Sequence, residues 1–265
     1  MKIIFLGTGT SHGVPPLDCM IEEHVRCKKD VCRLSADDPR HARTRSSILV
    51  EWDGKNILID VSLDFRQQAL REKIKRIDAV LITHCHADHI GGLPDLRSYT
   101  KPDGAPLPVF GSPESMDALR RSFGYMFDPN TFVGGGIPNI EIHAMNGPCA
   151  LVGKTIVPIA VEHGPLKGCF GYRLGPLVYI PDMKSINEDE LKKCAGAEVL
   201  ILNCLRGERE HISHCILPQS RAIALRIKPK QCYFIHMCHD IHYRIDRQGL
   251  EDWMDFSFDG LKKEI

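Results

Sequence analysis

A cluster of metal-binding side chains constrains this chain more than any other feature of its sequence. His84, His86, Asp88 and His89 occur within six residues, directly after the apolar run 77–82, which predicts a buried strand. Residues two apart in an extended chain point the same way, so His84 and His86 can meet at one point. Asp88 and His89 are expected in the turn that ends the strand. Imidazoles and a carboxylate in this spacing suit zinc, iron or manganese.

Charge and composition exclude several classes of protein. Lys plus Arg and Asp plus Glu both number 34, which argues against a broad basic surface for nucleic acid. No apolar stretch approaches membrane-spanning length, and the apolar start at residues 1–7 is too short for a signal-peptide core. The eleven cysteines are an odd number and are scattered along the chain, which favours reduced thiols in a cytoplasm over a disulfide framework.

Metal-compatible side chains also end several other apolar runs. Asp60, His163, Asp182 and His236 each stand at the end of a predicted strand, as His84 does. Chance does not readily explain metal-compatible side chains at the ends of five predicted strands. The predicted strands cover residues 2–6, 48–52, 56–60, 77–82, 150–152, 155–161, 168–174, 177–180, 199–202 and 232–235.

Helical spacing and loop signals divide the rest of the chain. Helices are predicted over residues 64–75, 113–123 and 219–227, with a short one beginning at 93–99. Residues 102–108 and 125–138 are expected to be loops, and the glycine run 134–136 suggests a mobile loop near a site entrance. No repeat or linker divides the chain, so a single α/β domain is the economical interpretation.

Three N-terminal segments leave alternatives open. Cys19, Cys27 and Cys32 lie in a charged loop with His24 between the first two, which favours a structural zinc over free thiols, with a fourth ligand from elsewhere. The glycine-rich stretch 7–15 lacks the third spaced glycine or Lys-Ser/Thr pair of a phosphate-binding loop, so a tight turn is expected. His12 could reach a neighbouring site, but a lone loop histidine is expected to be solvated. The basic stretch 39–47 is either a solvated turn or an anion contact.

The spacing His84-x-His86-x-Asp88-His89 resembles the signature of the metallo-β-lactamase superfamily. The resemblance covers nearly the whole chain and implies a four-layer αββα sandwich, with residues 1–265 as one hydrolase domain. By that likeness His84, His86 and His163 bind one metal, and Asp88, His89 and His236 bind a second. Asp182 bridges the two metals, and Asp60 orients a ligand histidine.

Further stretches resemble the phosphoribosyl cyclic phosphate phosphodiesterase branch of that superfamily. They are residues 7–15, 38–40, 43–47, 92–97 and 202–206, the pair His211-x-x-His214, and His236-x-x-His239-Asp240. The branch implies a distal structural zinc on Cys19, Cys27, Cys32 and His239, in a loop at about residues 15–45. The cysteine spacing is wider than usual for the branch, which leaves His24 as a rival of Cys27. His214 matches a histidine that contacts the scissile phosphate, with His211 the neighbouring match.

The implied reaction opens a small cyclic phosphodiester, such as a phosphoribosyl cyclic phosphate or a 2′,3′-cyclic nucleotide, to a monoester. Two zinc or manganese ions activate the attacking water. His214 assists the departing oxygen, with Asp60 and His211 in support. A small-molecule partner in a cytoplasmic protein is expected, without membrane or nucleic acid, and a homodimer is compatible. The alternatives are an RNA-processing nuclease, a thiolester hydrolase and a non-catalytic metal-binding protein.

Overall fold

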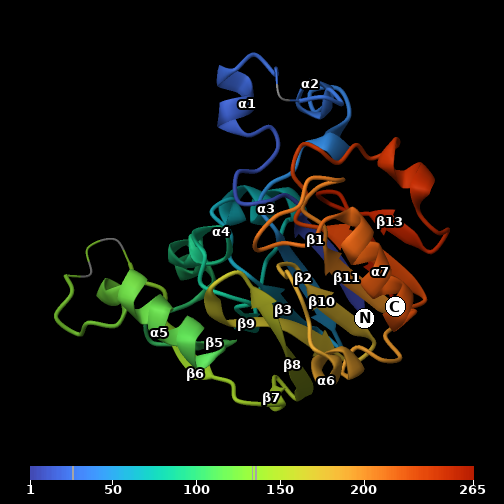
Figure 1. The fold of residues 1–265 in the computed structure, drawn as a ribbon. Helices are drawn as coiled ribbons and strands as arrows, with labels where there is room; N and C mark the ends of the chain where they lie inside the picture. Colours follow the sequence, from blue (N-terminus) through green and yellow to red (C-terminus); the bar gives the residue numbers. More distant parts are fainter. Residues whose placement is uncertain (26, 133, 135) are drawn as a thin grey trace.

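Two seven-stranded sheets form the centre of this computed structural model, which describes residues 1–265 except 26, 133 and 135 (Figure 1). The first sheet has the order β14 (Lys262–Glu264), β1 (Lys2–Gly7), β2 (Ser47–Trp52), β3 (Lys55–Ile59), β4 (Ala79–Leu81), β5 (Leu107–Gly111) and β6 (Ile140–Ala144). The second has the order β13 (Met254–Phe256), β12 (Gln231–Ile235), β11 (Val199–Asn203), β10 (Leu177–Ile180), β9 (Leu166–Leu174), β8 (Lys154–His163) and β7 (Cys149–Leu151).

Helices cover the outer faces of the sheets or lie in the connections. The α-helices are α1 (Leu17–Ile21), α2 (Val31–Leu34), α3 (Phe65–Glu72), α4 (Ala87–Ile90), α5 (Pro113–Ser122), α6 (Glu188–Lys192) and α7 (Leu217–Ile227). Short 3-10 helices are η1 (Pro39–His41), η2 (Leu93–Tyr99), η3 (Gly124–Met126) and η4 (Asp246–Gly249). No helix in the described part of the chain combines the length and apolar character needed to cross a membrane.

The alternation of side chains along the strands builds the layers. In β1, Ile3 and Phe5 pack between the two sheets, whereas Ile4 and Leu6 pack on the outer face against α3. In β11, Ile201 faces the other sheet, and its neighbours pack outward with α7. Both faces of each sheet are therefore buried, because a strand points alternate residues to opposite faces. The predicted four-layer αββα sandwich is confirmed.

Parallel pairing at the centre of each sheet decides where the site lies. Strands β3, β4, β5 and β6 run parallel, and so do β10, β11, β12 and β13. The carboxyl ends of parallel strands meet at one edge of the sheet. The candidate ligand histidines and aspartates follow these strand ends in the chain, so they lie at that edge. The loop with α1 and α2 projects beyond the sheets at the top of Figure 1, and β1 pairs with β14, so the two chain ends lie side by side.

Several predicted element boundaries were wrong. Asp88 and His89 lie in the short helix α4 rather than in a turn, and α3 is shorter than predicted. Leu107 and Pro108 belong to β5, although proline and glycine signals had placed them in a loop. A hairpin at Asp53 joins β2 to β3. Positions 133 and 135 of the predicted loop 125–138 lie outside the described residues.

Candidate metal centres and substrate cleft

The first group of candidate ligands joins one strand end from each sheet. His84 and His86 follow β4, and His163 is the last residue of β8. Nδ1 of His86 lies 3.0 Å from Nε2 of His84 and 3.3 Å from Nε2 of His163. Nδ1 of His163 donates to the carbonyl oxygen of Ser213 at 2.8 Å, which leaves the Nε2 lone pair free for a metal. These three nitrogens converge as metal ligands do.

The second group lies on the other side of His84. Asp88 and His89 are on α4, and His236 directly follows β12. Oδ2 of Asp88 lies 3.3 Å from Nε2 of His89 and 3.4 Å from Nε2 of His236. Asp88, His89 and His236 are all buried, and their donor atoms lie within 4.8 Å of one another. The geometry thus brings together both predicted ligand sets.

Asp182 lies between the two groups. Its Oδ2 is 2.9 Å from Nε2 of His89, and its Oδ1 is 3.1 Å from Nε2 of His236. Both oxygens are buried, yet neither has a well-oriented hydrogen-bond donor among the described residues. A buried carboxylate without such donors is costly unless a cation binds it. The donor set therefore fits two divalent ions that share Asp182.

Protonation states at the centre also suit metal binding. Burial lowers the pKa of His84 well below its ordinary value, and His89 adds to this effect. Burial lowers the pKa of His163 to about 4, although Asp182 opposes the shift. Burial raises the pKa of Asp182, but His236 and His89 outweigh it and hold this pKa well below its usual range. Both imidazoles are therefore neutral and the carboxylate is ionised at neutral pH, which is the form that ligates metal.

Asp60 contacts His89 directly. Its Oδ2 accepts from Nδ1 of His89 at 2.7 Å, and its two oxygens accept from the backbone N–H and the hydroxyl of Thr83, both at 2.8 Å. Burial lowers the pKa of His89, but Asp88 and Asp60 outweigh burial and raise it well above its ordinary value. This environment stabilises a cation at Nε2 of His89, whether a proton or a metal ion. Thr83, which sequence reasoning missed, also lies 3.1 Å from Nδ1 of His84.

His214 faces the same centre from the loop after β11. Its Nδ1 lies 3.1 Å from Oδ1 of Asp182, and its ring packs against His163 and His236 with centroid distances of 4.6 Å and 4.9 Å. His211 lies beside it, with 5.0 Å between the ring centroids. Nδ1 of His211 accepts the backbone N–H of Ser213 at 3.2 Å, so Nε2 carries the proton in the neutral ring.

Asn203 is a structural residue of the site that the strand-end pattern did not single out. Its Nδ2 donates to the carbonyl oxygen of Pro181 at 2.8 Å, and its Oδ1 accepts from the backbone N–H of Cys215 at 3.0 Å. It therefore links the segments that carry Asp182 and His214. Its position as the last residue of β11 is the signal that could have revealed it.

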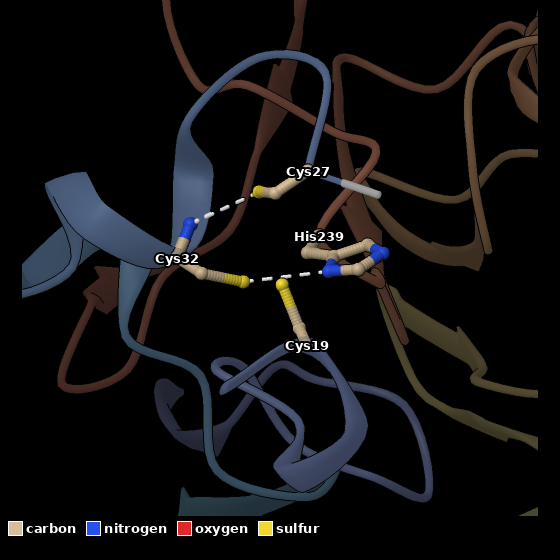
Figure 2. Close-up of side chains that lie close together, drawn as sticks. All are labelled: Cys19, Cys27, Cys32 and His239. Carbon is tan, nitrogen blue, oxygen red and sulfur yellow. Dashed lines mark hydrogen bonds between the residues drawn. The ribbon is translucent and has the colours of Figure 1, made fainter. Parts of the chain in front are cut away.

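The predicted zinc ligands come together in a separate cluster (Figure 2). Cys19, Cys27, Cys32 and His239 point toward one another, with ligand atoms within 4.8 Å. Nδ1 of His239 lies 3.3 Å from Sγ of Cys32, and Sγ of Cys27 accepts the backbone N–H of Cys32 at 3.3 Å. His24 lies 3.4 Å from Cys19 through Nδ1, but it is not part of the group of four. Three thiols and one imidazole fit a tetrahedral zinc, and the geometry favours Cys27 over His24.

A cleft of about 270 Å³ opens beside His214 and reaches the cysteine cluster. His12 and Arg209 lie in its wall, and Asp240 lines it next to His239. His12 is exposed, as expected, and it lies in the cleft beside the candidate site. The remaining lining residues are Thr10, Ser11, Gly13, Pro16, Asp18, Leu205, Arg206, His211 and Cys238.

The sequence model of a family described as beta-lactamase superfamily domain matches residues 55–237. This range covers more than half of the chain and includes every candidate ligand of the dinuclear centre. The chain belongs to the metallo-β-lactamase superfamily. A crystal structure described as a new diphosphatase from the PhnP family matches it with a TM-score of 0.88 and 35% identity, over 100% of this chain and 97% of that one. This superfamily member thus falls in the PhnP-like branch.

Other relatives extend the comparison. Zinc-bound PqqB from Methylobacterium extorquens shares the fold, with a TM-score of 0.76 at 23% identity over the full length of both chains. An octanoyltransferase from Porphyromonas gingivalis is 35% identical over 269 residues, and the chain spans 52% of that protein's length. Coenzyme PQQ synthesis protein B from Methylorubrum populi is 37% identical over 245 residues, which cover 77% of this chain and 72% of the relative. The comparisons place the chain among proteins of the metallo-β-lactamase fold.

Proposed function

We propose that the protein is a metal-dependent phosphodiesterase that opens a small cyclic phosphodiester to a phosphomonoester. The position of His214 carries this proposal. Its Nδ1 lies 3.1 Å from Asp182, between the dinuclear ligand set and the cleft. A hydrolase that expels a good leaving group, such as a thiolate, has less need of a proton donor at this place.

Three sets of side chains would hold metal ions in the active protein. One metal would be held by His84, His86 and His163, and a second by Asp88, His89 and His236, with Asp182 available to both. Divalent ions bound there would supply Lewis-acid activation of a phosphoryl oxygen and of a water molecule. A further zinc would be held by Cys19, Cys27, Cys32 and His239.

Proton transfer to the departing oxygen is assigned to His214. Burial lowers the pKa of His214, and the charge of Asp182, whose Oδ1 lies 3.1 Å from Nδ1, opposes this shift. With Nδ1 beside Asp182, Nε2 is left to act. In the reaction the water oxygen forms a new bond to phosphorus and releases one proton, one ring P–O bond breaks, and the departing oxygen receives the Nε2 proton. The proton that the water releases restores the one that His214 gives up. The products are one phosphomonoester and one hydroxyl, so a single water is added. His211 contacts the ring of His214 and helps to place it.

The size and charge of the cleft support a small anionic substrate. Its volume of about 270 Å³ suits a sugar phosphate rather than a folded polynucleotide. Arg206 and Arg209 lie in its lining with His12 and His211. Guanidinium and imidazole donors are the groups that bind phosphate oxygens.

A second candidate is hydrolysis of a diphosphate bond, which the similarity to a PhnP-family diphosphatase favours. The same ligands would serve both reactions. The leaving group would then be a phosphate, which is already acidic, so the reaction would depend less on His214.

A parallel assay separates these candidates. Metal-replete protein is given a nucleoside 2′,3′-cyclic phosphate, a nucleoside diphosphate sugar and an acyl thioester. We expect kcat/KM for the cyclic ester to exceed that for the other two by roughly 100-fold. Preference for the diphosphate would establish the second candidate. Preference for the thioester, or turnover of none of the three, would overturn the phosphodiesterase.

A further inference from the structure

A groove between α3 and η2 lies apart from both metal centres and from the substrate cleft. Its volume is about 500 Å³, and it shares no lining residue with the cleft beside His214. Its walls are α3 with the segment that follows it, and η2. A volume in this range over an apolar floor is typical of sites for small molecules.

The floor of the groove is apolar and already formed. Phe65 and Ala69 line it and are only 1% and 7% exposed. The hydroxyl of Tyr99 donates to the carbonyl oxygen of Ile74 at 3.0 Å, and the ring centroids of Phe65 and Tyr99 are 5.9 Å apart. These contacts tie η2 to α3 and to the segment after it. A ligand would therefore meet a site that needs little ordering on binding.

The two walls are also joined where each begins. The backbone N–H of Val61, in the segment before α3, donates to the carbonyl oxygen of His89 at 2.8 Å, and the N–H of Gly92 donates to the carbonyl oxygen of Val61 at 2.9 Å. A Cβ on Gly92 would lie 2.1 Å from the carbonyl oxygen of Ser62, so glycine permits this close approach. The groove thus lies between two elements that are fixed to each other.

Four basic side chains surround the floor, against one carboxylate. Arg66 is on the α3 wall and Arg97 on the η2 wall, while Lys73 and Lys75 follow α3. All four are exposed, and Asp95 is the acidic residue of the lining. Among the described residues, none of these four side chains forms an ion pair with a carboxylate. The lining therefore carries an excess of positive charge.

The acidic side chains nearest to three of these cations in the sequence are already held by other cations. The pairs, at 2.9 to 3.0 Å, are Asp64 with Arg45, Glu72 with Lys262, and Asp78 with Arg76. They leave the positive charge of the groove without a counterion from the neighbouring chain. Cations gathered beside an apolar surface raise the local concentration of anions.

We propose that the groove between α3 and η2 binds a small organic anion that carries an apolar ring or chain. The anionic group binds between Arg66 and Arg97. The apolar part covers Phe65, Ala69 and Leu70. A lipid surface fits less well, because the floor is recessed and Leu70, at 62% exposure, is the apolar lining residue that protrudes. The inference does not depend on the phosphodiesterase activity.

Two dyes of similar shape test the site: 1-anilinonaphthalene-8-sulfonate, which is an anion, and N-phenyl-1-naphthylamine, which lacks the sulfonate. The fluorescence of both rises in an apolar site. With metal-replete protein, we expect the anionic dye to bind roughly tenfold tighter than the neutral one. Arg66→Ala and Arg97→Ala should each weaken binding of the anionic dye several-fold and leave the neutral dye within about twofold. Leu70→Ala should weaken binding of both dyes.

Arg120→Ala and Leu225→Ala are the matched controls. Arg120 is an exposed arginine of α5, Leu225 is an exposed leucine of α7, and both lie outside the groove. Their loss should change the binding of neither dye. Equal affinities for the two dyes in the wild-type protein would overturn the site, as would tight binding of the anionic dye that survives in both Arg66→Ala and Arg97→Ala.

Sedimentation with phosphatidylglycerol vesicles tests the other occupant. We expect the wild-type protein to stay in the supernatant. Co-sedimentation that is lost in Arg66→Ala and in Leu70→Ala would overturn the small-anion site in favour of a membrane contact. Neither measurement uses turnover, so failure of the proposed phosphodiesterase would leave both results unchanged.

Discussion

Oδ2 of Asp60 lies 2.7 Å from Nδ1 of His89, and both side chains are fully buried. Asp60 sits at the end of β3 with the left-handed φ of 64°, while His89 is on α4. The contact fixes which nitrogen of His89 carries a proton, so Nε2 faces Asp88 and Asp182. A residue outside the candidate ligand set thus controls the orientation of one within it.

Asp60→Asn should therefore weaken the dinuclear centre. The amide has only one accepting oxygen and no charge, so it cannot accept from both the backbone N–H of Thr83 and Nδ1 of His89 as the carboxylate does. We expect roughly 10- to 100-fold lower affinity for one of the two metals. Metal content after dialysis against graded chelator measures this. Asp95→Asn, a half-buried aspartate of η2, is the control. Unchanged affinity in D60N would show that Asp60 is only a structural residue.

Cys32→Ser should remove one metal per chain and leave the dinuclear pair in place. Because zinc binding contributes to folding, the free energy of unfolding should fall by roughly 3 kcal/mol or more. The turnover rate per folded molecule should change little in comparison with this loss of stability. Cys149→Ser, at a half-buried cysteine of β7, should keep all metals. Full metal content in C32S would mean that these cysteines are free thiols.

The same measurement decides between Cys27 and His24. Sγ of Cys27 belongs to the cluster of four, and His24 contacts Cys19 from outside it. Cys27→Ser should lose the zinc, whereas His24→Ala should retain it. The opposite result would make His24 the ligand.

His214→Ala should keep full metal content and lose on the order of 100-fold or more in turnover of a cyclic ester with an alkoxide leaving group. The loss should be smaller for an aryl ester, whose acidic leaving group needs less protonation. His143→Ala, at a half-buried histidine of β6, serves as control. Equal losses on both esters would mean that His214 positions the phosphate, and no loss would remove it from the site.

His41 should make stability depend on pH. It is only 2% exposed, and burial, with Arg43 nearby, lowers its pKa to about 4. The unfolded chain therefore takes up a proton as the pH falls through about 6.5, whereas the folded chain does not until about pH 4. Stability is lost as the pH falls across this window.

Between pH 7 and pH 5 the free energy of unfolding of the wild-type protein should fall by about 2 kcal/mol more than that of His41→Gln. Denaturant unfolding at both pH values measures the difference. Comparison with the variant cancels the loss of zinc ligation, which affects both proteins. If the free energy of unfolding has the same pH dependence in the wild-type protein and in His41→Gln, His41 has the same pKa in the folded and unfolded states.

The sequence alone predicted the candidate ligand set because its chemistry is local. His84, His86, Asp88 and His89 stand in one short segment, and Asp60, Asp182 and His236 each follow an apolar run that only a buried strand explains. The alternating and continuous apolar runs also predicted most strands of both sheets. Elements whose signals were weak or mixed, such as β5 with its proline, were misplaced, because pairing with β4 and β6 holds that strand in the sheet.

Only the tertiary structure decided which side chains meet. No local signal brings His214 to Asp182, joins Cys32 to His239 across 207 positions, or places His12 in a cleft with Arg209. These contacts arise because parallel strands from two sheets end at one edge and because buried arginines hold the loops there. The identities of metal-binding residues are therefore readable along the chain, whereas the shape and charge of the space beside them depend on long-range packing.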